Sequence, residues 1–201
     1  VLGEAVVSEK EADQYAARYL DLLDLLARET ASWPERGKRI LAADRDFPLL
    51  NLSIKISALY SQIHPTDPET AVEKISVRLR PILRRAREVG AGSNVDRDSD
   101  ARKDLKLRLF KTIFSGEEFD EAPACGIAMQ AYLRDTEADL LDLIAWARGR
   151  QRRITVRLVK GAYWDYETII ARQRGWPVPV FARKADTDAN FEKLSGLLLE
   201  N

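Results

Sequence analysis

The chain has 201 residues, of which 45% are hydrophobic and 32% are charged, a composition typical of a globular domain with one sizeable core. Lysine plus arginine and aspartate plus glutamate both number 32, so the formal net charge is zero and no overall basic field favours nucleic-acid binding. Neither a membrane-spanning apolar run nor a signal peptide is evident, which predicts a cytoplasmic protein. The single cysteine, Cys125, excludes an internal disulfide and argues against structural zinc, so we expect no metal site.

Hydrophobic periodicity predicts helices and strands in alternation. Apolar residues recur at helical spacing in segments 9–30, 71–89, 104–114, 136–150, 165–174 and from about 187. Ser8 is the expected N-cap of the first of these helices. Strand-like patterns occur at 1–7, 50–57, 93–96, 126–133 and from 154. The last of them begins with β-branched and aliphatic residues, which predicts a buried strand. In segment 50–57 leucine and isoleucine alternate with Asn51, Ser53, Lys55 and Ser57, which predicts a strand with one polar face.

Five strands alternating with helices predict an α/β fold with a parallel sheet and right-handed crossovers. A doubly wound nucleotide-binding fold would show G-x-G-x-x-G or a P-loop after a strand, and the run Gly90–Ser93 instead precedes one. The pattern therefore favours a (β/α)₈ TIM-type barrel, which typically needs about 250 residues. We expect residues 1–201 to form a partial barrel domain with about the first five β/α units, without the C-terminal strands and the last helix.

Polar residues recur near the carboxyl ends of the predicted strands. They are Lys55, Asp96, Gln130, Arg157 and Lys160. In a parallel barrel these strand ends share the catalytic face, so the pattern predicts one polar pocket. An alternative interpretation is purely structural, with an internal Lys55–Asp96 ion pair and Gln130 bonded to a neighbouring backbone. The residues alone leave both interpretations open.

The stretch Arg157–Asp165, with the sequence RLVKGAYWD, resembles the signature of the flavin-dependent proline dehydrogenase family. It is most like the proline dehydrogenase domain of the bacterial bifunctional proline utilization A proteins. Four further segments are similar to that family and occur in the same order: residues 2–5, 53–59, 130–132 and 181–188.

The resemblance implies an oxidoreductase of proline catabolism, a flavoprotein that oxidises L-proline to pyrroline carboxylate with FAD in the intact protein. It implies that Lys55 binds the substrate carboxylate and that Glu4 is the first-strand glutamate beside the substrate. Asp96 and Arg157 are the implied catalytic residues, and a fixed guanidinium at position 157 suits a flavin that gains electron density. The implied cofactor-binding residues are Asp96, Arg97, Gln130, Arg157, Lys160, Gly161, Ala162, Tyr163 and Trp164.

Two features depart from the family pattern. After Asp96 the chain continues with Arg97, Asp98 and Ser99 where the family usually has a hydrophobic residue and glutamate, so Arg97 is expected to contribute mainly its backbone. The adjacent arginines and the tyrosine that the family's last helix brings to the substrate have no counterpart in these residues. The resemblance also implies a quinone electron acceptor, a fused aldehyde dehydrogenase domain and peripheral association with the inner membrane.

Two other hypotheses belong to different functional classes. One is a barrel enzyme of another substrate, in which Lys160 acts as an amine nucleophile or anion clamp. The other is a truncated or degenerate barrel without activity, whose open sheet edge favours pairing or aggregation. For Glu4 the alternative to a substrate-side role is an exposed acid at a strand end.

Overall fold

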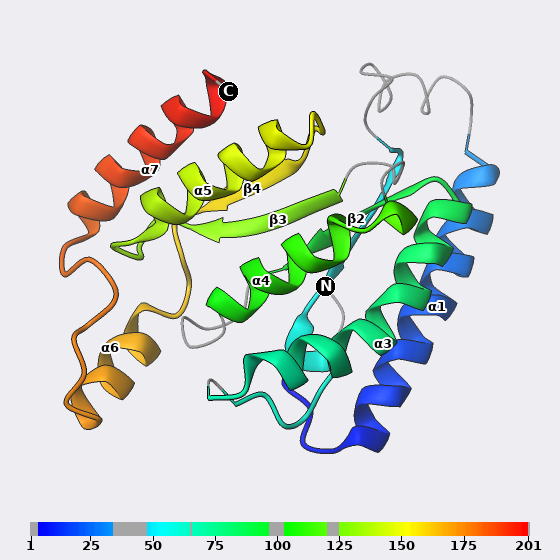
Figure 1. The fold of residues 1–201 in the computed structure, drawn as a ribbon, viewed down its shortest axis with the longest axis horizontal. Helices are drawn as coiled ribbons and strands as arrows, with labels where there is room; N and C mark the ends of the chain where they lie inside the picture. The colour runs from blue at the N-terminus through cyan, green and yellow to red at the C-terminus, as the bar shows by residue number, and fades with distance from the viewer. Residues whose placement is uncertain (1–3, 34–47, 65, 97–102, 120–124, 201) are drawn as a thin grey trace. The chain divides into compact units, whose positions relative to one another are not determined.

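The computed structural model describes residues 4–33, 48–64, 66–96, 103–119 and 125–200 (Figure 1). The chain divides into two compact units, residues 1–126 and residues 127–201, which are described separately.

The first unit is built from helices around a pair of strands. Its helices are α1 (Glu9–Ala31), α3 (Pro68–Glu88) and α4 (Lys103–Phe114), with short 3₁₀ turns at Ile56–Ala58 and Glu117–Phe119. Its strands are β1 (Leu50–Ile54) and β2 (Ala91–Val95). Helix α3 contacts both α1 and α4, and Figure 1 shows α1 and α3 side by side. Ser8 caps α1 by accepting a hydrogen bond from the Glu11 amide at 3.2 Å, as the sequence predicts.

Strands β1 and β2 pair in parallel, with Leu52 opposite Ser93, Ser53 opposite Asn94 and Ile54 opposite Val95. Side chains alternate along each strand, so this register sorts them onto two faces. One face holds apolar side chains such as Leu52 and Ile54, which are buried, and α1 and α3 contact these strands. The other face is polar, and the predicted two-sided strand is confirmed.

The second unit continues the alternation of strands and helices. Its strands are β3 (Cys125–Gln130), which begins at the unit boundary, and β4 (Thr155–Val159), which neighbours β3. Its helices are α5 (Thr136–Gly149), α6 (Trp164–Gln173) and α7 (Lys184–Leu199). The segment before α7 forms an antiparallel bridge between Val180 and Leu133, and both side chains are buried together with Tyr132.

Several predicted boundaries differ from the structure. Residues 4–7 of the predicted first strand form no strand, and residues 1–3 lie outside the described part. The second strand ends at Ile54 because the chain turns into a 3₁₀ helix, and β3 ends at Gln130 instead of residue 133. Helix α7 starts at Lys184, three residues before its expected start.

The strand around Arg157 was expected to be buried, and that expectation is wrong for the structure. All five residues of β4 are partly or fully exposed. Strand β3 neighbours β4, and no further strand follows β4 in the described part of the chain, so its apolar residues are covered incompletely.

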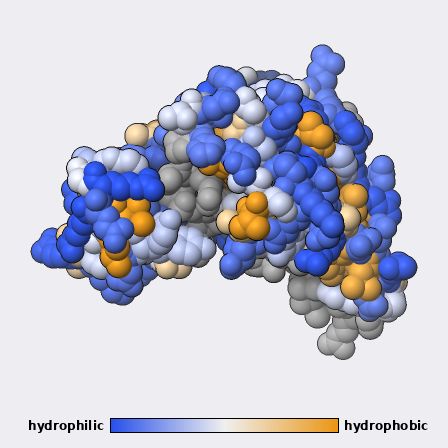
Figure 2. Space-filling model, turned by 90° about the horizontal axis from the view of Figure 1, so that it is seen from below, coloured by the Kyte–Doolittle hydropathy of each residue, from blue (hydrophilic) through white to orange (hydrophobic). Residues whose placement is uncertain are grey.

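Several large apolar side chains are exposed. The most exposed large hydrophobic side chains include Val7 and Val77 in the first unit and Tyr166, Ile169 and Trp176 in the second. On the face shown in Figure 2 the hydrophobic residues form small separate patches between hydrophilic ones. Within the described residues, no helix is both long and apolar enough to cross a bilayer.

A charged network ties α1, α3 and the segment after β1 together. The Arg78 side chain, 15% exposed, donates to Asp13 at 2.7 Å, to Glu9 at 2.8 Å and to the carbonyl oxygen of Leu59 at 3.0 Å. Glu9 also accepts from the amide and hydroxyl of Ser61 at 3.0 and 2.7 Å. Since the guanidinium is largely desolvated and donates three hydrogen bonds, this network contributes more than a surface ion pair.

Replacing Arg78 with alanine should lower the free energy of unfolding by about 2 kcal/mol, because hydrogen bonds to a charged group are lost and Leu59 keeps an unpaired carbonyl. Chemical denaturation of the first unit within the intact protein would measure this loss. Arg85→Ala is the matched control, since Arg85 makes two ion pairs from the same helix but is 39% exposed. An equal loss in both variants would contradict the special role of Arg78.

The network should also make stability depend on pH. Burial alone would raise the pKa of Glu9, but hydrogen bonds from Ser61 and Arg78 outweigh it and lower that pKa below the ordinary glutamate value. The native state therefore binds this proton less readily than the unfolded state, and the contribution is present above the ordinary pKa and lost as pH falls through the lowered one. The difference in stability between the wild type and Glu9→Gln should shrink over that acid range in denaturation curves. A difference independent of pH would refute this.

Candidate active site

In the first unit, Lys55 lies just beyond β1, and the family resemblance implies that it binds the substrate. Its backbone amide donates to the phenolic oxygen of the buried Tyr19 at 3.2 Å, which fixes the strand end against α1. Its side chain is 15% exposed, and its ammonium lies 3.9 Å from a carboxylate oxygen of Glu4, whose side chain is 89% exposed. The cation is therefore mostly removed from water but only weakly neutralised.

Asp96 follows β2 and extends the pairing by one step. Its amide donates to the carbonyl oxygen of Ile54 at 2.8 Å, and the residue is 4% exposed. The register of β1 and β2, continued by one residue, sets Asp96 beside Lys55 on the polar face. The ion pair that Lys55 makes in the structure is nevertheless with Glu4, so the structural alternative of a Lys55–Asp96 pair is not what is observed.

Four residues form the polar patch at this end of the two strands. We call Ser53, Lys55, Asn94 and Asp96 the polar quartet: Ser53 and Lys55 are from the β1 side, and Asn94 and Asp96 from the β2 side. Sequence reasoning identified the two charged members and missed Asn94. The spacing in the sequence could have identified it, because Asn94 lies two residues before Asp96 and residues two apart on a strand share a face.

In the second unit, Gly161 lies against an aromatic ring. Its φ angle is +130°, a conformation that favours glycine, and a Cβ built there would lie 2.4 Å from Cγ of Tyr132. The Tyr132 amide donates to the carbonyl oxygen of Lys160 at 2.8 Å, which holds the two strand ends together. The family resemblance implies that Gly161 binds the cofactor; in the structure the Tyr132 ring fills the side of the glycine on which a Cβ would lie.

Lys160 is held by acidic and aromatic partners from α7. Its ammonium lies 2.5 Å from Asp188 and 5.7 Å from the centre of the Phe191 ring. Asp188 also pairs with Lys184 at 2.7 Å. The hydrogen bond from Lys160, followed by that from Lys184, lowers the pKa of Asp188 below its ordinary value. This end of the unit thus gathers two cations around one carboxylate near the start of α7.

The other predicted residues of this unit occupy different environments. Gln130 is buried at the end of β3, and its backbone carbonyl oxygen accepts a hydrogen bond from the Thr136 hydroxyl at 2.5 Å. Arg157 is exposed on β4. The Trp164 indole donates to the carbonyl oxygen of Phe181 at 2.7 Å. Ala162 and Tyr163 lie between these anchors in the loop, one exposed and one half-buried.

The structure groups the predicted residues by unit. Glu4, Lys55 and Asp96 lie together in the first unit, and the residues from Lys160 to Trp164 follow β4 in the second. Arg97 lies outside the described residues, so its predicted backbone role is untested. Besides Asn94, sequence reasoning missed Asp188 as the partner of Lys160, although it belongs to the Asp186–Asp188 segment that the resemblance includes.

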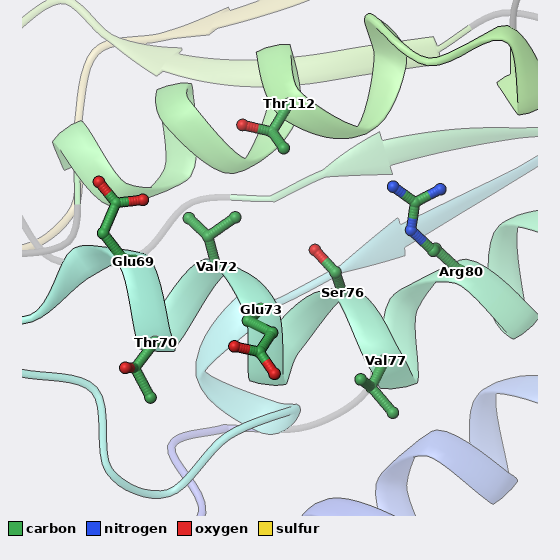
Figure 3. A pocket seen from close by; sticks show the side chains of 8 residues that line it. All are labelled: Glu69, Thr70, Val72, Glu73, Ser76, Val77, Arg80 and Thr112. Atoms are coloured by element: carbon green, nitrogen blue, oxygen red, sulfur yellow. The ribbon is translucent and has the colours of Figure 1, made fainter.

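A depression in the first unit lies elsewhere, between α3 and α4. It has a volume of about 580 Å³, and Figure 3 shows its lining. Thr112 comes from α4, and the other seven lining residues come from α3: Glu69, Thr70, Val72, Glu73, Ser76, Val77 and Arg80. Arg80 and Glu69 are already engaged by ion pairs with Glu118 and Arg108. The depression is a feature of the helical surface, remote in sequence from the strand ends.

Among the residues that the structure describes, no group of three histidine, cysteine, aspartate or glutamate side chains could hold a metal ion. The predicted strand-end residues and the polar quartet carry ammonium, guanidinium, carboxylate, carboxamide and hydroxyl groups.

A comparison with protein-family models shows to which family the chain belongs. The family model described as proline dehydrogenase matches residues 1–201. The chain belongs to the proline dehydrogenase family. The resemblance predicted from the Arg157–Asp165 stretch is thereby confirmed.

Individual relatives agree with this family. The bifunctional protein PutA of Escherichia coli K12 is 28% identical over 192 residues, which cover 95% of this chain and 14% of that protein. The proline dehydrogenase of Deinococcus radiodurans is 25% identical over 199 residues, covering 96% of this chain and 58% of that protein. This family segment thus spans about one seventh of the bifunctional relatives it matches.

A solved structure has the same fold as this chain. The crystal structure of proline utilization A from Bdellovibrio bacteriovorus, inactivated by N-propargylglycine, has a TM-score of 0.91 and 41% identity. The match covers 100% of this chain and 21% of that one. The predicted α/β fold of the (β/α)₈ barrel type is therefore confirmed for this proline dehydrogenase family member.

Gly161→Ala should destabilise the second unit by about 3 kcal/mol, because a Cβ clashes with Tyr132 and the positive φ is strained. Gly175→Ala is the matched control: its φ is +66°, and nothing lies within 4 Å of the added Cβ. The control should cost only about 1 kcal/mol, the usual price of the left-handed conformation. Thermal or urea unfolding measures both. Equal losses would show that the Tyr132 contact does not matter.

Proposed function

We propose that the protein containing this chain oxidises L-proline to pyrroline carboxylate with FAD, the first step of proline catabolism. The single observation that carries the proposal is the environment of Lys55, a cation 15% exposed and 3.9 Å from its carboxylate partner Glu4. A desolvated ammonium with a weak partner favours an anionic ligand, and the carboxylate of a small amino acid is such a ligand. Membership of the proline dehydrogenase family supports proline as that amino acid.

The residues present fit a flavin in two respects. The buried amide of Asn94 has neither its nitrogen nor its oxygen hydrogen-bonded among the described residues, so the polar quartet offers unused hydrogen-bonding capacity. In the second unit Lys160, Arg183 and Lys184 supply positive charge at the start of α7, which suits a phosphate-bearing group. We assign the flavin-facing roles to Gln130, Arg157 and the Lys160–Trp164 loop on the strength of the family resemblance.

In the reaction the ring carbon beside nitrogen loses a hydride and the nitrogen loses a proton, which leaves a carbon–nitrogen double bond. FAD, when bound, accepts the hydride. Lys55 would orient proline by its carboxylate, and Arg157 would stabilise the added electron density through its fixed charge. Asp96, buried beside Lys55, would organise the substrate side of the site. A quinone acceptor and peripheral membrane association complete the proposal and rest on the family resemblance alone.

The Lys160 nucleophile hypothesis receives less support. The Lys160 nitrogen is half-exposed and already engaged by Asp188 at 2.5 Å, so the atom that would attack a carbonyl carbon is held by another partner. Borohydride trapping with a carbonyl substrate separates this hypothesis from the flavin one, since trapping is expected to fail here.

The first test is a visible absorption spectrum of the purified full-length protein before and after anaerobic addition of proline. We expect a flavin band that bleaches with proline. A colourless protein that takes up no added FAD would contradict the proposal and leave the barrel without activity as the better hypothesis.

Two substitutions then separate the roles of the site. Lys55→Ala should keep FAD and raise the KM for proline by about ten- to hundredfold, the equivalent of one charge-assisted hydrogen bond. Arg157→Ala should lower the flavin content or the rate of flavin reduction instead. Lys74→Ala and Arg148→Ala, at exposed helix positions, are the matched controls for the loss of a charge. A Lys55→Ala enzyme with unchanged KM would remove Lys55 from the substrate site.

A further inference from the structure

The chain leaves the sheet directly after β1, at the peptide group that joins Ile54 to Lys55. The carbonyl oxygen of this group accepts a hydrogen bond from the Asp96 amide at 2.8 Å, on the side where β2 lies. Its N–H belongs to Lys55 and donates to the hydroxyl of Tyr19 at 3.2 Å. Because the C=O and N–H of a trans peptide point in opposite directions, these two partners hold the group from both sides.

Tyr19 is itself held firmly. It lies on α1, 36 residues before Lys55, and its side chain is fully buried. Helix α1 contacts both β1 and the 3₁₀ turn that follows it, so the ring is packed where the strand ends. Within the described residues, no strand pairs with the edge of β1 opposite β2. The hydroxyl therefore gives the Lys55 amide the acceptor that a neighbouring strand would otherwise supply.

The orientation of this peptide group affects where the Lys55 side chain points. The Cα atom of Lys55 lies in the plane of the group, so a rotation of the plane also displaces the side chain that Cα carries. The next peptide group is held as well, because the carbonyl oxygen of Lys55 accepts from the Ala58 amide at 3.2 Å. A lysine side chain is long and flexible, and its fixed point is the backbone. Here that fixed point is set on one side by Tyr19.

We propose that Tyr19 is a positioning residue for substrate binding, whose hydroxyl holds the backbone of Lys55 so that the ammonium meets the substrate carboxylate. This inference rests on the proposed function, in which Lys55 binds the carboxylate of proline. Tyr19 touches neither substrate nor cofactor in this scheme and acts through Lys55. Charge-assisted hydrogen bonds are short and depend on geometry, so a displaced ammonium should bind the carboxylate more weakly.

The test is Tyr19→Phe in the flavin-loaded full-length protein, because this change removes the hydroxyl and keeps the ring that fills the core. We expect the KM for proline to rise by about threefold to tenfold, the equivalent of one neutral hydrogen bond, while kcat and the flavin content stay at the wild-type level. The kinetics are measured well below the Tm of the variant, so that a loss of stability alone cannot change KM. An unchanged KM, whatever the Tm, would make Tyr19 a purely structural residue and overturn the proposal.

A double-mutant cycle shows whether Tyr19 acts through Lys55. In the Lys55→Ala enzyme, Tyr19→Phe should raise KM no further, because the ammonium that Tyr19 positions is gone. An equal rise in both backgrounds would overturn the proposal. Tyr15→Phe is the matched control, since Tyr15 lies one turn earlier on α1 and is only half-buried, and a rise of KM in this variant would also count against Tyr19.

Failure of the proposed function gives a different result. A Lys55→Ala enzyme with unchanged KM, or a wild-type flavin that proline does not bleach, would refute the proposed function itself. A Lys55→Ala enzyme with a raised KM beside a Tyr19→Phe enzyme with a normal one would refute the positioning role alone.

Discussion

The parallel pairing of β1 with β2 is the constraint on which the first unit depends. Because the strands are in register, burying Leu52 and Ile54 beneath the helices necessarily turns Lys55 and Asp96 to the other face. A slip of one residue in either strand would exchange the faces of that strand and place its charged residue, Lys55 or Asp96, in the apolar core. Hydrophobic burial therefore fixes the site residues, and the polar face needs no separate folding signal.

The fold could be predicted from the sequence wherever a single periodicity was strong. The strict alternation after Leu50 gave both the strand and its polar face, and Ser8 marked the start of α1. Segment ends were less predictable, because they depend on tertiary hydrogen bonds. Strand β1 stops at Ile54, where the Lys55 amide meets Tyr19 from α1, a partner 36 residues away that no local pattern reveals.

The candidate site was predictable in its charged residues and less so in its neutral ones. Lys55, Asp96 and Lys160 stand out because a charge in a strand-like segment needs a reason, whereas Asn94 does not interrupt the pattern. Gly161 was recognised as special for a reason that differs from the observed one, because the ring of Tyr132 comes from another strand. The burial of β4 was overestimated. β-branched residues show that a strand suits a core, but its burial also depends on how many strands and helices lie beside it.

The indole of Trp164 has a consequence for motion in the second unit. By donating to the carbonyl oxygen of Phe181, it joins the loop after β4 to the segment that leads into α7. The Lys160–Asp188 pair makes a second link between the same two regions. Because these two contacts join the regions at different points, the segment after β4 cannot shift far without the start of α7. The loop and the helix should thus respond as a single mechanical element, and the emission of this partly exposed indole offers a built-in optical reporter of its state.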